Sequence, residues 1–356
     1  MRLFGAKSAY RNAHIATFGA ASNVTPKPAG CAVIQVKPGI GDVIWHLPFI
    51  RAIAAATLGG RVAFLAPPTS RAKELLAAES CVAETIYFEH AGSELRRGLN
   101  LIRLVGLLRH RHFGAIWILD RTIRPALAAR LAGIPERIGL GLGSQRFFIT
   151  NPGVDHSHFH DHPIGWLSAL MTAMKVPLPS TEPDLRLPDA TLAAIGEKFQ
   201  TAARPWIVLG IGASHPDKDW PDAHWAELVA FLRHRTNGTV YLIGGQANFA
   251  RAQHFIAGSA GANIVNACNL DLIEAAALLR LADLFVGPSS GPLNLAAAGG
   301  TDAFGLFGST PVLSYSRFIH AVEPPGGQSA DGMRRIAPAQ VITAIEPYLS
   351  RQKPRP

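Results

Sequence analysis

The chain has 356 residues, of which 48% are hydrophobic, so it is long enough to form two α/β domains with buried cores. Its apolar runs are short and interrupted by polar residues, which argues against a helix that spans a bilayer. The three cysteines are far apart, which argues against a disulfide framework or a cysteine metal site and favours a reducing compartment, the cytoplasm.

The formal net charge of +9 is unevenly distributed along the chain. Residues 31–150 contain 15 Lys and Arg against 8 Asp and Glu, a balance of +7, whereas residues 201–350 contain 9 against 11, a balance of −2. A basic surface concentrates anionic ligands, so an anionic acceptor, an anionic membrane surface or a nucleic acid are open alternatives. No zinc-finger spacing, RNA-binding sheet motif or block of basic residues accompanies the charge, so we expect no nucleic-acid partner.

The first 29 residues contain no acidic residue and several small or basic ones. We expect a flexible extension there, with a weak membrane-surface segment or a targeting peptide as alternatives. After it, short apolar strands alternate with helical stretches. The front half predicts strands at 32–36, 62–65 and 115–119, and helices at 42–58, 71–79 and 95–109, the first of them bent or started late by Pro48.

A proline-rich segment, 151–204, follows and contains one helical stretch near 164–174. A second alternating unit then predicts strands at 206–209, 240–243, 284–286 and 303–306, and helices at 224–235, 272–281, 292–298 and 339–349. Such alternation favours parallel sheets. Two units of this kind predict a cleft between them, which is a usual place for a ligand.

The first candidate site is the segment Lys37-Pro-Gly-Ile-Gly-Asp42, between a predicted strand and a predicted helix. Its glycines allow a sharp turn and a close approach to a ligand. Asp42 is then either the N-cap of the helix or a general base that deprotonates an acceptor hydroxyl. A dinucleotide site would need a third glycine where Ile44 stands, which argues against NAD.

The second candidate site is Gly210-Ile-Gly-Ala-Ser214 with Asp217-Lys-Asp-Trp-Pro221, also between a strand and a helix. Small residues and backbone amides at such a turn suit phosphate, and Lys218 can offset the charge of a diphosphate leaving group. The alternative is a plain turn with a solvated lysine. Asp217-Lys-Asp219 also matches the aspartate pair of metal-dependent glycosyltransferases, which we attribute to chance.

The third candidate site runs from Gly287 to Gly300, with Leu306-Phe-Gly-Ser-Thr-Pro311 after it. Pro292 suits the first turn of a helix, whose amides and dipole would face an anion, and Ser289 and Ser290 add hydroxyls. Two small-residue turns after adjacent strands are typical of a ligand site in an open α/β sheet. The alternative is that these turns serve packing only.

The histidine-rich segment His156-Ser-His-Phe-His-Asp-His162 suggests a metal site. It misses the His-x-His-x-Asp-His spacing of dinuclear hydrolases by one residue and lies in a polar linker. We therefore expect a solvated loop and no bound metal.

Together these segments resemble glycosyltransferase family 9, the heptosyltransferases of lipopolysaccharide core assembly. The resemblance covers about 32–349. It rests on Gly41-Asp42 with Pro48 and Arg51, Gly143 to Phe148, Gly212-Ala-Ser214 with Lys218, Trp220-Pro221 and Trp225 to Leu228, Ser290-Gly291 with Leu295 to Ala298, Leu306-Phe-Gly308, and Thr310-Pro311.

The resemblance implies a GT-B architecture, with two Rossmann-like domains whose parallel sheets face a central cleft. Residues 30–185 would bind the acceptor, residues 186–350 would bind the nucleotide sugar, and 351–356 would be a tail. It also implies inverting, metal-independent transfer with no cofactor besides the donor, which ADP-heptose would suit. The acceptor would be an anionic glycolipid or glycan, and the enzyme would be cytoplasmic, with peripheral contact with the inner-membrane surface.

Carried onto this chain, the family pattern makes Asp42 the catalytic base and makes Lys218 the group that stabilises the departing diphosphate. The other expected residues fall into two groups. On the donor side they are Gly212, Ser214, Ser289, Ser290, Gly291, Asn294, Gly308 and Thr310. On the acceptor side they are Lys37, Gly41, Arg51 and Arg121.

Two positions depart from the family pattern, which usually has an acid where Ser289 stands and a histidine where Asn294 stands. Losing a hydrogen-bonding group of this kind typically costs about 1–3 kcal/mol. Two alternatives to efficient transfer from ADP-heptose therefore stay open, a different donor and weak turnover. The alternatives are a non-catalytic binder of sugar nucleotides or glycolipids and, third, a dinucleotide-dependent oxidoreductase.

Overall fold

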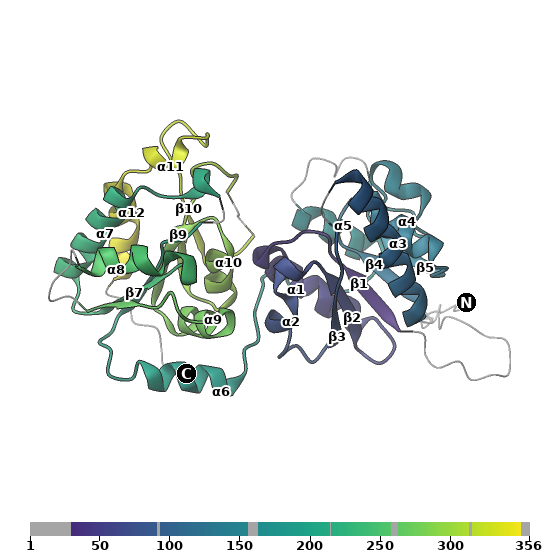
Figure 1. The fold of residues 1–356 in the computed structure, drawn as a ribbon, viewed down its shortest axis with the longest axis horizontal. Coiled ribbons are helices and arrows are strands. Elements are labelled where there is room, and N and C mark those ends of the chain that lie inside the picture. Colours follow the sequence, from purple (N-terminus) through teal and green to yellow (C-terminus); the bar gives the residue numbers. More distant parts are fainter. Residues whose placement is uncertain are drawn as a thin grey trace, which may run out of the picture.

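The computed structural model describes residues 30–90, 93–155, 163–213, 215–257, 263–312 and 315–349. Within them the chain forms two parallel β-sheets with helices packed around each, arranged one beside the other along the long axis (Figure 1). The prediction of two α/β units with parallel sheets is confirmed. The expected extension 1–29, the tail 351–356 and the segment His156–His162 lie outside the described residues.

The N-terminal sheet has the order β3-β2-β1-β4-β5, and all its pairs are parallel. Its strands are β1 (Cys31–Ile34), β2 (Val62–Ala66), β3 (Val82–Tyr87), β4 (Ala115–Ile118) and β5 (Glu136–Gly139). Alternate residues of β1 enter different cores, Val33 on one face of the sheet and Ala32 and Ile34 on the other. Because both faces are covered, β1 is a continuous apolar run.

The helices around this sheet are α1 (Ile40–Ala55), α2 (Ala72–Leu75), α3 (Glu94–Arg111), α4 (Ile123–Leu131) and α5 (Pro163–Ala173). The late start expected for the first helix is wrong, because Gly39 caps it and Pro48 lies inside it. The helix expected at 71–79 is reduced to the single turn α2.

The C-terminal sheet has the order β11-β10-β9-β6-β7-β8, again all parallel. Its strands are β6 (Trp206–Gly210), β7 (Thr239–Ile243), β8 (Ile264–Asn266), β9 (Leu284–Pro288), β10 (Asp302–Leu306) and β11 (Ile319–Val322). The helices are α6 (Asp189–Lys198), α7 (Asp222–Arg235), α8 (Phe249–Ala257), α9 (Leu272–Leu281), α10 (Gly291–Ala298), α11 (Gly332–Arg335) and α12 (Pro338–Ile345). The last expected helix therefore ends earlier, at Ile345, and a 3₁₀ turn follows.

The chain crosses between the sheets after α5 and before α6. The backbone N–H of Leu185 donates to the carbonyl of Ala298 at the end of α10 (3.0 Å). Helix α6 then packs against α9, below the C-terminal sheet in Figure 1. We therefore propose a division into an N-terminal domain, 30–185, and a C-terminal domain, 186–350. No helix in the described part of the chain is long and apolar enough to cross a membrane.

Candidate active site in the interdomain cleft

A cleft of about 960 Å³ lies between the two domains. Its lining follows β1 and β2 in the first domain, and in the second domain it includes the turns after β6 and β9, between which the strand order reverses. Crevices at such points, outside the carboxyl ends of the strands, bind ligands in open α/β sheets. Both domains line the cleft. From the N-terminal domain come Pro38 to Asp42, Trp45 and Arg71. The residues from the C-terminal domain include Gly212, Lys218, Ile243 to Gln246, Asp271, Ser289 to Pro292, Asn294 and Thr310.

Asp42 lines the cleft from the first turn of α1. Its side chain is 18% exposed, its Oδ2 accepts a hydrogen bond from the N–H of Gly39 (3.1 Å), and its Oδ1 lies 3.7 Å from Lys37 Nζ. Burial raises the pKa of the Asp42 carboxyl, and the charge of Lys37 and the Gly39 hydrogen bond oppose this rise. The alternative that Asp42 is the N-cap of the helix is wrong, because Gly39 is the N-cap and Asp42 is the third residue of α1.

The other residues expected on the acceptor side are dispersed. Gly41 lines the cleft, and Lys37 lies beside Asp42 with its Nζ over the ring of Trp45, 5.9 Å from the ring centroid. Arg121 follows β4, is exposed, and stacks on the ring of Trp166 at 5.0 Å. It is not among the residues that line the cleft.

The structure corrects the expectation for Arg51. Its guanidinium forms two hydrogen bonds with the carboxylate of Glu79 (2.6 and 3.1 Å) and donates to the carbonyl of Asp184 (2.6 Å). The Glu79 side chain is fully buried. Arg51 therefore neutralises a buried acid and ties α1 to the crossing segment, so we do not retain it as an acceptor-binding residue.

On the donor side, the turns after β6 and β9 meet. Lys218 Nζ donates a hydrogen bond to the carbonyl of Ser289 (3.5 Å), which holds the lysine beside the N-terminus of α10. A Cβ at Gly212 would lie 2.6 Å from Asn248 Nδ2 and 3.0 Å from the carbonyl of Gly244, so this turn needs glycine to pack. Ser214, expected beside it, lies outside the described residues.

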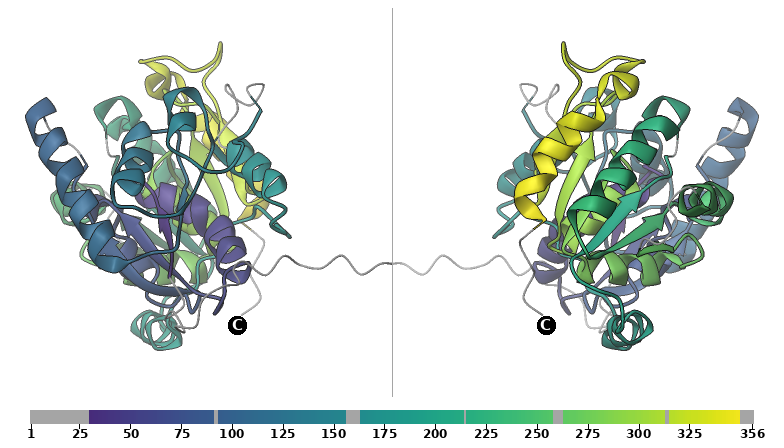
Figure 2. Two further views of the ribbon diagram at one scale, coloured as in Figure 1. Left: turned by 90° about the vertical axis from the view of Figure 1, so that its right-hand side faces the viewer. Right: turned by 90° about the vertical axis from the view of Figure 1, so that its left-hand side faces the viewer.

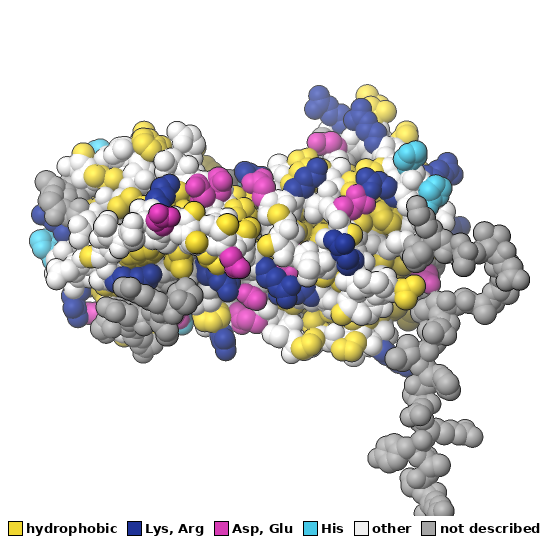
Figure 3. Space-filling view, turned by 90° about the horizontal axis from the view of Figure 1, so that it is seen from below, with side chains coloured by type: hydrophobic (Ala, Val, Ile, Leu, Met, Phe, Trp, Pro, Cys, Tyr) yellow, Lys and Arg dark blue, Asp and Glu magenta, His cyan; other side chains and the backbone are white. Residues whose placement is uncertain are grey.

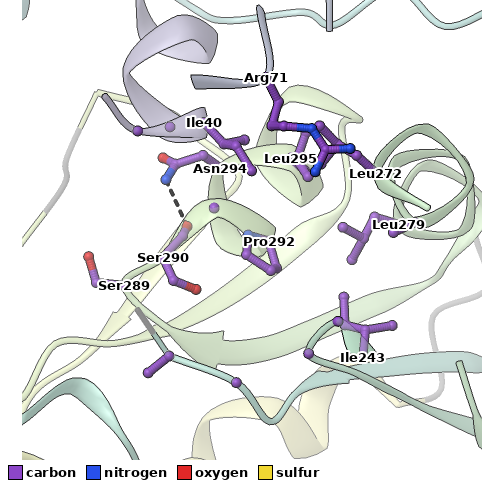
Figure 4. Close-up of a pocket in the computed structure, with 18 of the residues that line it drawn as sticks. Ile40, Arg71, Ile243, Leu272, Leu279, Ser289, Ser290, Pro292, Asn294 and Leu295 are labelled. Carbon is purple, nitrogen blue, oxygen red and sulfur yellow. Dashed lines mark hydrogen bonds between the residues drawn. The ribbon is translucent and has the colours of Figure 1, made fainter. Parts of the chain in front are cut away.

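Gly291 and Pro292, the first residues of α10, line the cleft, and the N-terminus of a helix carries backbone amides without a partner in the helix. Ser290 is the N-cap residue, yet its hydroxyl makes no capping hydrogen bond. Its Oγ is buried and has no hydrogen-bond partner among the described residues. Figure 4 shows Ser289 and Ser290 at the same end of the cleft. This end therefore offers hydroxyls and amides that suit phosphate oxygens.

In the second small-residue turn, Gly308 to Thr310 after β10, the two expected residues have different surroundings. Thr310 lines the cleft. Gly308 does not, and a Cβ there would lie 2.3 Å from the backbone nitrogen of Met333. The structure thus supports only the packing alternative for Gly308.

The opposite end of the cleft is apolar. Ile243, Leu272, Leu279 and Leu295 point into it, and Arg71 reaches over Leu272 and Leu295 from the other domain (Figure 4). The sequence analysis missed Arg71, which adopts a left-handed backbone conformation with φ of 54° between a 3₁₀ turn and α2. Its position two residues after a Pro-Thr turn that follows a strand was the available signal.

Asn294 connects the two domains. Its Oδ1 accepts hydrogen bonds from Trp45 Nε1 in α1 (2.6 Å) and from the hydroxyl of Tyr315, and its Nδ2 donates to the carbonyl of Ser290 (2.8 Å). The rings of Trp45 and Tyr315 meet edge to face at 5.1 Å. Gly41 makes the approach possible, because a Cβ there would lie 2.6 Å from Asn294 Nδ2. The sequence analysis missed Trp45 and Tyr315, although Trp45 lies one helical turn from Gly41.

The comparisons with known proteins agree with this geometry. The family model described as glycosyltransferase family 9 (heptosyltransferase) matches residues 101–321, which is more than half of the chain. The chain belongs to glycosyltransferase family 9. It is therefore a glycosyltransferase, and the alternative of a dinucleotide-dependent oxidoreductase is wrong. The curated protein lipopolysaccharide heptosyltransferase 2 of Salmonella typhimurium LT2 is 26% identical over 279 residues, which are 70% of this chain and 79% of that protein.

Solved structures of the family share the fold. The ADP-heptose lipopolysaccharide heptosyltransferase II of E. coli matches with a TM-score of 0.71 and 22% identity over 90% of this chain and 98% of that one. A family 9 glycosyltransferase of Veillonella parvula matches with a TM-score of 0.73 and 17% identity over 90% and 97%. The E. coli heptosyltransferase WaaC with ADP matches with a TM-score of 0.66 and 18% identity over 89% and 97%. The expected GT-B architecture is confirmed.

Within this glycosyltransferase, an arginine pairs with one of the two aspartates of the Asp217-Lys-Asp219 pattern. Arg251 Nη1 contacts both carboxylate oxygens of Asp219 (2.9 and 3.0 Å), and Asp217 is exposed beside His215. No group of three or more metal-ligating side chains converges within the described residues.

We expect Asn294→Ala to lower the free energy of unfolding of this family 9 enzyme by about 1–3 kcal/mol, because it removes the oxygen that accepts hydrogen bonds from two half-buried donors, Trp45 Nε1 and the Tyr315 hydroxyl. Urea denaturation followed by circular dichroism measures the change. Tyr315→Phe, which removes one of those donors together with its bond, should cost less. Equal stability of wild type and Asn294→Ala would contradict the role of this network.

Proposed function

We propose that this glycosyltransferase moves a heptose or related sugar from a nucleoside diphosphate donor to a hydroxyl of an anionic lipopolysaccharide-core or similar glycan or glycolipid, with inversion and without a metal. One observation carries the proposal. A carboxylate, Asp42, and a phosphate-type site, formed by Lys218 and the start of α10, line the same cleft from opposite domains. The relatives named above as heptosyltransferases suggest ADP-heptose as the first donor to test.

The two ends of the cleft suggest the orientation of the donor. The base and ribose would occupy the apolar end with Ile243 and Leu279, because a nucleobase stacks well on apolar side chains. The diphosphate would lie at Ser289, Ser290 and Gly291, against the amides of α10. Thr310 and Gly212 would border the donor, and the sugar would point toward Asp42.

In the proposed step, Asp42 accepts the proton of the acceptor hydroxyl as that oxygen bonds to the anomeric carbon. The bond from this carbon to the diphosphate breaks on the opposite face, and the electron pair leaves with the nucleoside diphosphate. Lys218 stabilises the charge that develops there. Attack from the face opposite the leaving group inverts the configuration of the anomeric carbon.

The acceptor would approach from the N-terminal domain, where Lys37, Gly41 and Arg121 are proposed to contact it. The charge of +7 over residues 31–150 supports an anionic acceptor. We further propose that the protein acts in the cytoplasm in peripheral contact with the inner-membrane surface, where such a glycolipid is anchored.

The test is a screen of nucleotide sugars by thermal shift, followed by release of the nucleoside diphosphate in the presence of a lipopolysaccharide-core acceptor. We expect ADP-heptose or a related donor to stabilise the protein and to be consumed. The identity of the donor is tested first because Ser289 and Asn294 stand where the family usually has an acid and a histidine. Stabilisation by a nucleotide sugar without any turnover would instead favour a non-catalytic binder.

We expect Lys218→Ala to lower kcat by about 10²-fold or more, because removing one preorganised group that stabilises developing charge has effects of this size. Initial rates of diphosphate release measure it. Lys218→Arg, which keeps the charge, should recover part of the loss, and Lys198→Ala, at an exposed position on α6, should leave the rate unchanged. A fully active Lys218→Ala enzyme would contradict the assignment.

A further inference from the structure

Helix α3 lies on the outside of the N-terminal domain, and none of the residues that line the cleft belongs to it. Its inner face packs on the sheet and on α4 through Leu104 and Leu108, which are 5% and 1% exposed. Figure 2 shows this blue helix as the outermost element of one side of the molecule. Within the described part of the chain, no element covers its outer face.

The outer face of α3 carries three large apolar side chains. Leu95, Leu99 and Ile102 are 77%, 47% and 69% exposed. Their spacing of four and three residues places them on one line along the helix, opposite the buried Leu104 and Leu108. One exposed leucine is ordinary, but three in a row on a projecting helix form a patch that marks an interaction site.

Arginines flank this apolar line. Arg96 and Arg103 are exposed and form no ion pair within the described residues. At the end of the helix, Arg109 donates to the carbonyl of Leu131 (3.4 Å), whose own side chain is 50% exposed. In Figure 3, Lys and Arg side chains surround hydrophobic ones on the projecting part of the N-terminal domain where α3 lies. The helix sequence contains five arginines and one acid.

We propose that the outer face of α3, defined by Leu95, Leu99, Ile102, Arg96 and Arg103, docks onto a membrane surface that carries anionic lipid headgroups. A basic amphipathic helix suits this partner, because its apolar side chains enter the boundary between headgroups and acyl chains while its arginines pair with anionic headgroups.

A second copy of the chain is a poor occupant for the same face. A twofold contact through α3 would place the arginines of one copy against the same arginines of the other. An anionic surface instead complements them, and docking through α3 leaves the cleft free for substrates. The inference specifies the membrane contact within the proposed function, but vesicle binding needs no sugar transfer, so the two can fail separately.

The experiment is flotation of the full chain with vesicles of phosphatidylcholine alone or with about 30% phosphatidylglycerol, at low and high salt. We expect binding only to the anionic vesicles, weakened by salt. The variant Leu95→Ser/Leu99→Ser/Ile102→Ser should lower the bound fraction about tenfold or more. Arg96→Gln/Arg103→Gln should also weaken binding, whereas Leu58→Ser, at an apolar position that is 87% exposed outside α3, should bind like wild type.

Circular dichroism and the rate of diphosphate release with a detergent-dispersed acceptor should be the same for all variants, because the changed side chains are exposed and lie outside the cleft. Wild-type protein that binds neither vesicle, or a triple serine variant that floats as well as wild type, would overturn the proposal. So would self-association, measured by light scattering, that disappears in the triple serine variant.

Discussion

Asp42→Asn is expected to lower kcat by about 10²–10⁴-fold, the range over which a general base contributes to a rate. The amide cannot accept the proton of the acceptor hydroxyl, but it keeps the size of the carboxylate and an oxygen for the hydrogen bond from Gly39. Donor affinity, measured by isothermal titration with the nucleoside diphosphate, should change little. A loss of affinity with an unchanged kcat would instead make Asp42 a binding residue.

Asp217→Asn is the matched control for this experiment. Asp217 lies on the loop that carries Lys218, is exposed, and does not line the cleft. The same carboxylate-to-amide change there should leave kcat within about twofold, as expected for a solvated side chain without a role in the reaction. A large loss in this variant would favour a metal bound by the Asp217-Lys-Asp219 segment.

The raised pKa of Asp42 predicts opposite effects of pH on activity and on stability. Activity should rise with pH as the carboxyl loses its proton and becomes the base, and Asp42→Asn should lose this acidic limb. Stability runs the other way. Because the folded state holds the proton more tightly than the unfolded state, unfolding becomes easier as pH rises from the ordinary pKa of 3.8 through the raised one. At neutral pH the Asn variant should therefore melt no lower than wild type, which differential scanning fluorimetry measures.

The strands that the sequence predicts are the central ones. Each is buried on both faces and reads as a continuous apolar run, as β1, β6 and β9 do. The missed strands β3, β5, β8 and β11 are the four edges of the two sheets. Edge strands contact solvent along one side and accept polar residues, such as Glu84 in β3 and Arg137 in β5, so their hydrophobic pattern is weak.

The turns that form the site could be predicted from the sequence, but the contacts between its side chains could not. Glycines and small residues after apolar strands indicate where a ligand approaches the backbone, and Asp42, Lys218 and Ser290 do line one cleft. Local pattern carries no information on a partner 249 residues away, which is the separation of Trp45 and Asn294. Arg51 was misassigned for the same reason, because its partner Glu79 lies 28 residues away, in the turn between α2 and β3.

Arg51→Ala is expected to lower the free energy of unfolding by about 3–5 kcal/mol, the cost of leaving a buried charge without its partner. Among the described residues, the fully buried Glu79 carboxylate would then keep only a long hydrogen bond of 3.4 Å from the backbone N–H of Arg186. The variant also loses the bond from α1 to the carbonyl of Asp184. Chemical denaturation of the full chain measures the change.

Arg235→Ala is the control for a surface ion pair. Arg235 and Glu346 are both about half exposed and lie 3.1 Å apart, so breaking their contact should cost less than about 1 kcal/mol.

The double variant Arg51→Met/Glu79→Leu tests whether the unpaired Glu79 carboxylate causes the loss of stability in Arg51→Ala. If it does, the double variant should recover most of the loss, since apolar residues can replace a buried ion pair at little cost. An Arg51→Ala protein of normal stability with a raised KM for the acceptor would restore the acceptor-binding role. If Arg51 serves only Glu79 and the Asp184 carbonyl, its loss should leave the acceptor KM of the folded protein unchanged, because the guanidinium is already engaged by these two partners.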